Sequence, residues 1–470
     1  MQEYSSGISM EEVLESCREG FLNISGQDLL FSRDFTKEEF SARRKNLAGR
    51  IGKGAHMLVP SAPPQPGHNP CQDASFYYLT GLELVHSHLL INGDDGHCTL
   101  FVSTRELVDG VDADKLGYED ADLIRDRLMV DEVKPTTDLT TALSKVKKVY
   151  VPFAELEGGG VTRGIANMCA AAREQAEWDG AEPTHKRLIR KLEERFPGIV
   201  IENANGFIGD LRRIKTPSEI KLMRQGGHLS ALIMIESMKA TKVGMCESRL
   251  EAIARYIFAS YGNCDLGYGV IAASGKRIVN GHYHFNNQTL EDGEVVLMDC
   301  GPDLRHYSSD IARLWPVNGK YSDWHRKVYG FIVEYHKVLL KMLKPGPCPA
   351  DIYVEAAEIM RHGCKNNLFE CGDMSELLDF MVERGIRYYN HGVGMSVHDA
   401  ISPWRDGPLE EGMVIAVDPM VTIQEKSQYI RVEDTVVITR DGCERLTGAA
   451  PFEMNEIEEL MKQPSEFGNI

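Results

Sequence analysis

The apolar positions of this chain fall into short runs that predict strands, and two neighbouring runs each carry one aspartate. Asp299 ends the run Val295–Met298, and Asp310 precedes a second apolar run that follows a turn at Gly301 and Pro302. A carboxylate in an apolar strand has to be paired, protonated or bound to a cation, because burying it bare is unfavourable by several kcal/mol. Two such aspartates on adjoining strands therefore indicate a metal site.

A second pair of apolar runs repeats this arrangement near the C-terminal end. The run Met413–Ile423 carries Asp418, the run Tyr429–Thr439 carries Glu433, and valine and isoleucine are frequent in both. Two hairpins would therefore direct four carboxylates inward. Four crowded carboxylates repel one another unless cations neutralise them, so the pattern predicts two divalent ions.

The segment between the two predicted hairpins supplies histidines. Within Asn390–Asp399 lie His391 and, seven residues further on, His398. Because imidazole is a ligand of divalent transition metals, one of these two side chains would complete the set of ligands.

Helix-start signals and short strands divide the rest of the chain. Thr36 with Glu39, and Thr216 with Glu219, each form a capping box that predicts a helix start. The residues Ser75–Leu82 form an aromatic cluster that we interpret as core packing. In the first half, strands are expected at Ala55–Val59, His86–Ile91, Cys98–Val102 and Lys148–Phe153, and a helix at His185–Phe196. In the second half, helices are expected from Pro217 to about Met238 and at Ser248–Tyr261, Ser322–Leu343 and Pro349–His362.

Length and composition bound the protein class. A chain of 470 residues exceeds one compact core, so we predict a polar extension over residues 1–34, a smaller α/β domain over 35–205 and a larger α+β domain over 206–470. The net charge of −18 argues against a nucleic-acid or anionic-membrane partner. Eleven scattered cysteines without a CxxC pair favour reduced thiols. With no signal-peptide pattern and no long apolar stretch, a cytoplasmic location is expected.

Several motifs together resemble those of the pita-bread metallopeptidases, the family of aminopeptidase P and prolidase. They are NGHYHFNN, MDCGPDLRHYSSDIARLWPV, NHGVGMSVHD, EEGMVIAVDP and IRVED, spread from about Leu211 to Thr447. In the first half, FTKEEFSARRKNLAGRI and FYYLTGL resemble the N-terminal domain of aminopeptidase P. The resemblance implies a pita-bread catalytic domain preceded by a smaller α/β domain.

The resemblance also implies a ligand set and a reaction. Two metal ions, Mn²⁺ first with Co²⁺ or Zn²⁺ as alternatives, would be held by five side chains, of which Asp310 and Glu433 bridge both ions. A hydroxide between the ions would attack the N-terminal Xaa–Pro bond of a peptide with proline at its second position and release the N-terminal amino acid. Because members of the family are commonly dimers or tetramers, the resemblance also implies that this chain forms a homo-oligomer. The implied ligands are Asp299, Asp310, His391, Asp418 and Glu433.

Further roles follow from the same resemblance. His282 and His398 match two histidines that contact the scissile group, and Arg431 matches an arginine beside the bridging carboxylate. His284, two positions after His282, is expected to point away and to be structural. Asp418 stands where the family has a glutamate that also moves a proton during catalysis, and aspartate reaches about 1.5 Å less far.

Two other departures concern the substrate rim. Arg387 stands where relatives have a histidine of the proline pocket, which predicts a changed preference or an acidic group in the substrate. The segment Met420–Ile423 replaces the usual residues after the ligand–proline step. A prolidase-type dipeptidase, a lyase or amidase on the same scaffold and a non-catalytic binding subunit therefore stay open, and retention of acidic or histidine residues at all five ligand positions disfavours the last.

Overall fold

The computed structural model describes residues 15, 26–63, 71–107, 115–262, 264–366, 374, 376–379, 390–399 and 407–467. The chain separates into two compact units, one over Gly20–Arg212 and one over Arg213–Asp399 and Pro403–Ile470. The predicted ranges 1–34, 35–205 and 206–470 stay predictions. No helix in these described ranges is long and apolar enough to cross a membrane.

The N-terminal unit is built on a six-stranded mixed sheet in the order β4-β3-β2-β1-β5-β6. The pairs β1–β2 and β2–β3 are antiparallel, whereas β3–β4, β1–β5 and β5–β6 are parallel. The expected strands are confirmed to within about two residues at each end. The strands are β1 (His56–Pro60), β2 (His88–Asn92), β3 (Cys98–Val102), β4 (Glu132–Pro135), β5 (Lys148–Val151) and β6 (Val200–Asn203).

Helices surround this sheet, and their starts follow the sequence signals. The Thr36 hydroxyl accepts a hydrogen bond from the Glu39 backbone N–H at 3.2 Å, as the capping signal predicts. Every residue of α3 is buried, which confirms that the aromatic cluster belongs to the core. The helices are α2 (Lys37–Ile51), α3 (Ala74–Thr80), α4 (Ala121–Leu128), α5 (Leu139–Leu143), α6 (Arg163–Gln175), α7 (Thr184–Arg195) and α8 (Asn205–Arg213).

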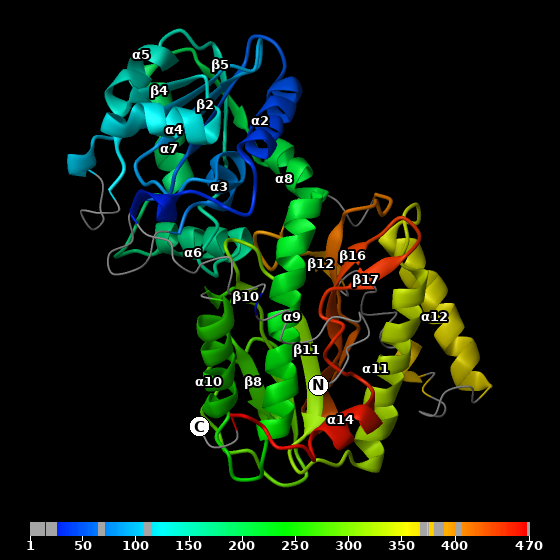
Figure 1. Cartoon of the computed structure of the whole chain (residues 1–470). Helices are drawn as coiled ribbons and strands as arrows, with labels where there is room; N and C mark the ends of the chain where they lie inside the picture. The colour runs from blue at the N-terminus through cyan, green and yellow to red at the C-terminus, as the bar shows by residue number, and fades with distance from the viewer. Residues whose placement is uncertain are drawn as a thin grey trace. The chain divides into compact units, whose positions relative to one another are not determined.

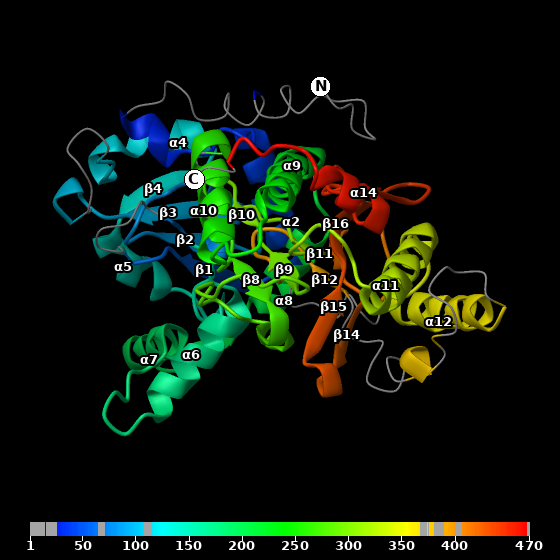
Figure 2. The same cartoon turned by 90° about the horizontal axis from the view of Figure 1, so that it is seen from below.

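The C-terminal unit holds a seven-stranded sheet in the order β12-β13-β16-β11-β9-β8, with β17 also paired to β16. Helices α9 and α10 gather on one side of these strands, and α11 and α12 on the other (Figures 1 and 2). The strands are β8 (Ile271–Ser274), β9 (Val295–Asp299), β11 (Ile311–Pro316), β12 (Asn390–Gly392), β13 (Val414–Val417), β16 (Glu433–Ile438) and β17 (Cys443–Arg445), and the short pair β7 (Asp265–Leu266) and β10 (Pro302–Asp303) forms a separate sheet.

The helices of this unit begin where capping residues predict. Thr216 and Glu219 form the complete capping box of α9, with Pro217 in the first turn, and Ser322 caps α11 by accepting a hydrogen bond from the His325 backbone N–H. The helix expected at Ser248–Tyr261 changes to a π-helix at Phe258. The helices are α9 (Pro217–Ala240), α10 (Ser248–Ile257), α11 (Asp323–Met342), α12 (Pro349–Lys365) and α14 (Met454–Leu460).

The two predicted hairpins differ in continuity. The first is present, since β9 and β11 pair antiparallel with Asp299 opposite Ala312. The second is interrupted: β13 pairs with β16 in the large sheet, whereas β14 (Met420–Ile423) and β15 (Gln428–Arg431) form a two-stranded sheet of their own. The break falls at Pro419, which has no N–H to donate within a sheet. Asp418 therefore lies at a junction between two sheets.

Candidate metal centre

The four predicted acids come together at one end of the large sheet. Asp299 is the last residue of β9, Asp310 directly precedes β11, Asp418 follows β13 and Glu433 begins β16. Each is at most 4% exposed. Four buried carboxylates from four segments therefore share one small volume.

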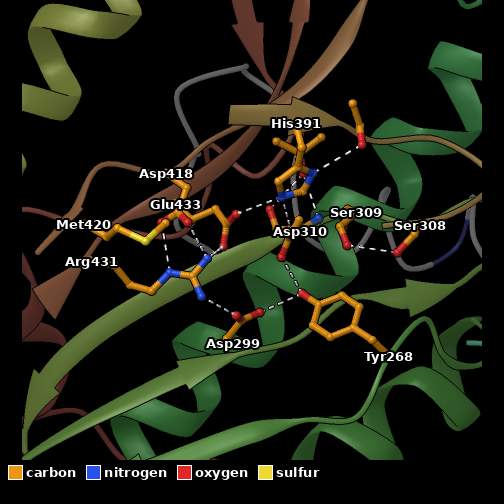
Figure 3. Close-up of polar contacts among 12 residues, drawn as sticks. Tyr268, Asp299, Ser308, Ser309, Asp310, His391, Asp418, Met420, Arg431 and Glu433 are labelled. Atoms are coloured by element: carbon orange, nitrogen blue, oxygen red, sulfur yellow. Dashed lines mark hydrogen bonds and ion pairs between the residues drawn. The ribbon is translucent and has the colours of Figure 1, made fainter. Parts of the chain in front are cut away.

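His391 brings the imidazole to this group from β12, which pairs with β13. Its Nε2 lies 3.3 Å from Asp310 Oδ2 and 3.7 Å from Glu433 Oε1 (Figure 3). One ligand atom from each of Asp310, His391 and Glu433 lies within 4.8 Å of the others, a spacing at which one ion could contact all three.

The other two acids face the guanidinium of Arg431, the last residue of β15. Asp418 accepts two hydrogen bonds from it, at 2.9 and 2.6 Å, and Asp299 accepts one at 2.7 Å. Glu433 Oε2 accepts another, at 2.5 Å. Arg431 thus contacts three of the four carboxylates directly (Figure 3), which is a closer association than the single neighbouring contact expected from the sequence.

Tyr268 is a member of the cluster that sequence reasoning missed. Its hydroxyl lies 2.8 Å from Asp299 Oδ1 and 2.6 Å from Asp310 Oδ1 (Figure 3). A phenol has one proton, so its hydroxyl can donate a hydrogen bond to only one carboxylate at a time. Because it lies within hydrogen-bond distance of both carboxylates, it keeps them at a fixed separation. No local signal marks this tyrosine, because its partners follow 31 and 42 residues later.

Burial and mutual repulsion shift the pKa values of the cluster. Burial raises the pKa of Asp299 to about 6, and burial together with the charge of Glu433 raises the pKa of Asp310. Burial alone would lower the pKa of His391, but the close contacts of its ring with the carboxylates of Asp310 and Glu433 raise it to about 10. A bound divalent cation would favour the ionised carboxylates and displace the imidazole proton.

One orphaned atom shows that the residues fit a cation. Glu433 Oε1 is buried and has no hydrogen-bond partner among the described residues, and the ring nitrogen Nε2 of His391 lies 3.7 Å away, beyond hydrogen-bond distance. An unpaired buried carboxylate oxygen is unfavourable unless a cation contacts it. Oxygen ligands with one imidazole suit a divalent metal ion, so the donor set of Asp310, His391 and Glu433 fits such an ion.

Comparison with known proteins decides the family. Residues 221–440 match the model of metallopeptidase family M24, and residues 40–150 match the model of the aminopeptidase P N-terminal domain. This chain belongs to metallopeptidase family M24. Its catalytic domain has the pita-bread fold of aminopeptidase P, and the smaller domain at its N-terminal side is of the aminopeptidase P type, as the sequence predicted.

Two bacterial relatives of this M24 protein align with it over almost their entire length. The Xaa-Pro aminopeptidase of Haemophilus influenzae is 28% identical over 461 residues, covering 92% of this chain and 99% of the relative. The Xaa-Pro aminopeptidase of Escherichia coli K12 is 27% identical over 455 residues, covering 91% and 98%. The structure of E. coli aminopeptidase P with the inhibitor Pro-Leu is similar with a TM-score of 0.72 at 25% identity, covering 91% of this chain and 98% of that one.

The remaining predicted residues of this M24 protein lie in different surroundings. The His398 ring packs edge-on against His391, with centroids 4.3 Å apart. His282 is exposed, and its charge influences the pKa of Asp299. The expectation that His284 points away is wrong: its ring stacks with His282 at 6.5 Å, because alternate residues of an extended chain share one side. Arg387 lies outside the described residues.

Proposed function

We propose that this chain is a metal-dependent Xaa-Pro aminopeptidase, which hydrolyses the N-terminal Xaa–Pro bond of a peptide and releases the N-terminal amino acid. The observation that carries the proposal is the buried Asp310–His391–Glu433 group inside an M24 domain. Support comes from relatives named Xaa-Pro aminopeptidase that match over nearly their full length. A similar enzyme has been solved with Pro-Leu, a dipeptide that begins with proline.

In this proposal five side chains hold two divalent ions. The residues that would hold them are Asp299, Asp310, His391, Asp418 and Glu433. Two divalent ions supply Lewis acidity and a water activated near neutral pH. Mn²⁺ is the proposed ion on the ground of its preference for oxygen ligands. A zinc-substituted form of E. coli aminopeptidase P is among the similar structures, and metal analysis of the purified protein distinguishes Mn²⁺ from Zn²⁺.

The other residues of the site orient groups or move protons. Tyr268 holds the carboxylates of Asp299 and Asp310, and Arg431 holds those of Asp418 and Glu433. Such contacts fix ligand orientation and tune ligand basicity. Asp418 stands where the family has a glutamate that moves a proton during catalysis. We therefore assign Asp418 the transfer of a proton to the departing proline nitrogen, a step that requires a carboxyl group able to accept and release it.

Two histidines complete the proposed substrate site. His398 packs on His391, and His282 is exposed and lowers the pKa of Asp299 through its charge. An imidazole N–H at either position would donate a hydrogen bond to the scissile peptide group. Arg387 is proposed to contact the residue that fills the proline pocket, where a cation would favour an acidic group in the substrate.

The proposal is tested with an Xaa-Pro-Xaa tripeptide and added Mn²⁺. Release of the free N-terminal amino acid is expected from the tripeptide, and less from an Xaa-Pro dipeptide, which a prolidase would prefer. His391→Gln is expected to abolish release, and the control His362→Gln, at an exposed position near the end of α12, is expected to leave it unchanged. Absence of tripeptide cleavage under conditions in which two ions are bound would contradict the peptidase assignment.

Assembly and compartment complete the proposal. Buried free thiols such as Cys98, Cys300 and Cys364 suit a reducing compartment, and we propose a cytoplasmic enzyme.

We also propose a homodimer or homotetramer. Measurement of the native mass by light scattering tests the assembly, and a monomeric mass at micromolar concentration would contradict it.

A further inference from the structure

The N-terminal unit contains a cavity of about 330 Å³ that the proposed peptidase reaction does not use. It lies between the sheet and helices α5 and α7, and all of its lining residues belong to the Gly20–Arg212 unit. Its walls are largely apolar, with Leu58 from β1, Leu143 from α5 and Leu192 from α7. Cavities of this size, lined by apolar side chains with a few polar groups, are typical of small-molecule sites.

Helix α7 packs only partly against the sheet at this cavity. Leu192 is buried, at 3% exposure, but Leu188 and Phe196 on the same face are partly exposed. Leu188 and Leu192, four residues apart, share one face of the helix, and Phe196 directly after the helix end lines the same cavity, so the three side chains form a continuous apolar stripe. The stripe faces the cavity and leaves apolar surface that an apolar group could cover.

Three cations line the same cavity from α7. Arg187, Lys191 and Arg195 are spaced four residues apart and are exposed. None of them forms an ion pair with a carboxylate in the described part of the chain. Arg187 has an electrostatic effect on the pKa of Glu182, but the two side chains are not in ion-pair contact. Like charges at this spacing repel one another, which is unfavourable for the helix unless an anion lies between them.

The neighbouring cations of the same helix behave differently. Lys186 forms an ion pair with Glu174 at 2.6 Å, and Arg190 forms ion pairs with Glu182 at 3.0 Å and Glu194 at 2.9 Å. The helix therefore neutralises the cations that do not line the cavity and leaves those at the cavity without a carboxylate. In a chain with a net charge of −18, these three side chains form a local group of cations that no carboxylate neutralises.

The opposite wall contributes one enclosed polar atom. Nδ1 of His88, in β2, is buried and has no hydrogen-bond partner among the described residues. Burial, with a smaller effect of His86, lowers the pKa of His88 to about 4, so its ring is neutral at neutral pH. A neutral imidazole nitrogen can donate or accept one hydrogen bond, and a bound polar group would supply the missing partner.

We propose that this cavity binds a small aliphatic carboxylate, with its hydrocarbon chain against the leucines and its carboxylate among Arg187, Lys191 and Arg195. The apolar walls exclude a fully polar anion as the best ligand, because such an anion would leave the stripe of α7 uncovered. The three cations disfavour a neutral or cationic amphiphile. The inference is independent of the peptidase proposal, since it rests only on residues of the N-terminal unit.

The test is a calorimetric titration of the full-length chain with decanoate, below its micelle concentration. Saturable binding of one decanoate per chain is expected, at least tenfold tighter than binding of decanol, and no binding of decyltrimethylammonium. Arg187→Gln, Lys191→Gln and Arg195→Gln, made together, are expected to weaken decanoate binding at least tenfold. Lys186→Gln with Arg190→Gln is the matched control on the same helix and should leave decanoate binding unchanged.

A steric variant adds a second readout. Leu139→Trp fills the cavity from the first residue of α5, a partly buried position, and is expected to abolish decanoate binding while Xaa-Pro tripeptide cleavage is retained. If circular dichroism shows that this variant does not fold, the charge variants alone test the proposal. Equal affinity for decanol and decanoate, equal losses in the triple and control variants, or no saturable decanoate binding would each overturn the proposal.

Discussion

Two consecutive acids of β16, Glu433 and Asp434, are both fully buried yet have opposite surroundings. Successive side chains of a strand point to opposite faces of the sheet, so the two carboxylates lie on different sides. Each is 0% exposed. On one side the fold supplies cations for the carboxylate, and on the other it gathers further carboxylates.

Asp434 is fully neutralised by protein groups. Arg313 donates to its Oδ1 at 2.8 Å, Thr447 donates to the same oxygen at 2.6 Å, and Arg445 Nε lies 3.1 Å from Oδ2. His336 Nε2 lies 2.9 Å from Oδ2. Burial alone would raise the pKa of Asp434, but the guanidinium groups of Arg313 and Arg445 and the hydrogen bond with His336 hold it far below its ordinary value. Asp434 therefore needs no metal.

Glu433 has no such surroundings. Its Oε2 contacts Arg431, which is shared with two other acids, and its Oε1 has no hydrogen-bond partner in the described ranges, with the His391 ring 3.7 Å away and shared with Asp310. The difference teaches that a buried acid in an apolar strand does not by itself indicate a metal. What indicates a metal is a buried acid for which the surrounding protein provides too few cations.

The largest expected effect separates the two acids by stability. In metal-free protein with chelator, Asp434→Asn should lower the free energy of unfolding by about 3–5 kcal/mol, because it leaves buried guanidinium groups without their anion. Glu433→Gln should lower it by less than about 1 kcal/mol or raise it, because it removes one of several repelling charges. Urea denaturation measures both variants, and equal losses would contradict the comparison.

The second effect concerns stabilisation by metal. Mn²⁺ at a hundred times its dissociation constant should raise the unfolding free energy of the natural chain by about 2.7 kcal/mol, because only the folded state assembles the ligands. Glu433→Gln should remove most of this gain. Thermal denaturation with Mn²⁺ and with chelator provides the measurement, and an undiminished gain in Glu433→Gln would show that the ion binds elsewhere.

A third, smaller effect tests the support of the ligands. Tyr268→Phe should weaken Mn²⁺ binding about 10- to 100-fold, because it removes the hydroxyl that positions Asp299 and Asp310. The control is Tyr429→Phe, since that hydroxyl donates to the sulfur of Met420, 2.8 Å away, and not to a carboxylate. Calorimetric titration with Mn²⁺ compares them, and similar losses in both variants would argue against a positioning role.

The smallest expected effect concerns the shortened acid. Asp418→Glu should change turnover of an Xaa-Pro-Xaa tripeptide by less than tenfold, or improve it, because it restores the longer side chain of the family. A tenfold loss, about 1.4 kcal/mol in transition-state stabilisation, would instead show that the site is tuned to aspartate and its two hydrogen bonds with Arg431. Steady-state kinetics at saturating Mn²⁺ distinguishes the two results.

Much of the fold was predictable because its signals are local. The caps at Thr36 and Thr216, and the apolar runs that became β9 and β11, involve residues close together in sequence. The break at Pro419 was also visible as a residue without an N–H, but its consequence was not. Whether β14 and β15 join the large sheet depends on neighbouring elements, which the sequence pattern does not specify.

The candidate site was predictable in its chemistry and less so in its contacts. Asp299, Asp310 and Glu433 were identified as buried acids from their apolar neighbours alone, and His391 as a candidate imidazole. The contacts of Tyr268 and the reach of Arg431 to three acids were missed, since they join segments up to 132 residues apart. Arg387 remains a prediction.

The sequence by itself determined which side chains are acidic, which strands carry them and where the helices begin, because residue type, strand alternation and capping act over a few positions. Only the tertiary structure decided that Asp434 contacts Arg313, Arg445 and His336. Its neighbour Glu433 lies among other carboxylates, with too few cations around it to neutralise its charge. The reason is physical. The stability of a buried charge depends on every group packed around it, and folding brings those groups from distant parts of the chain.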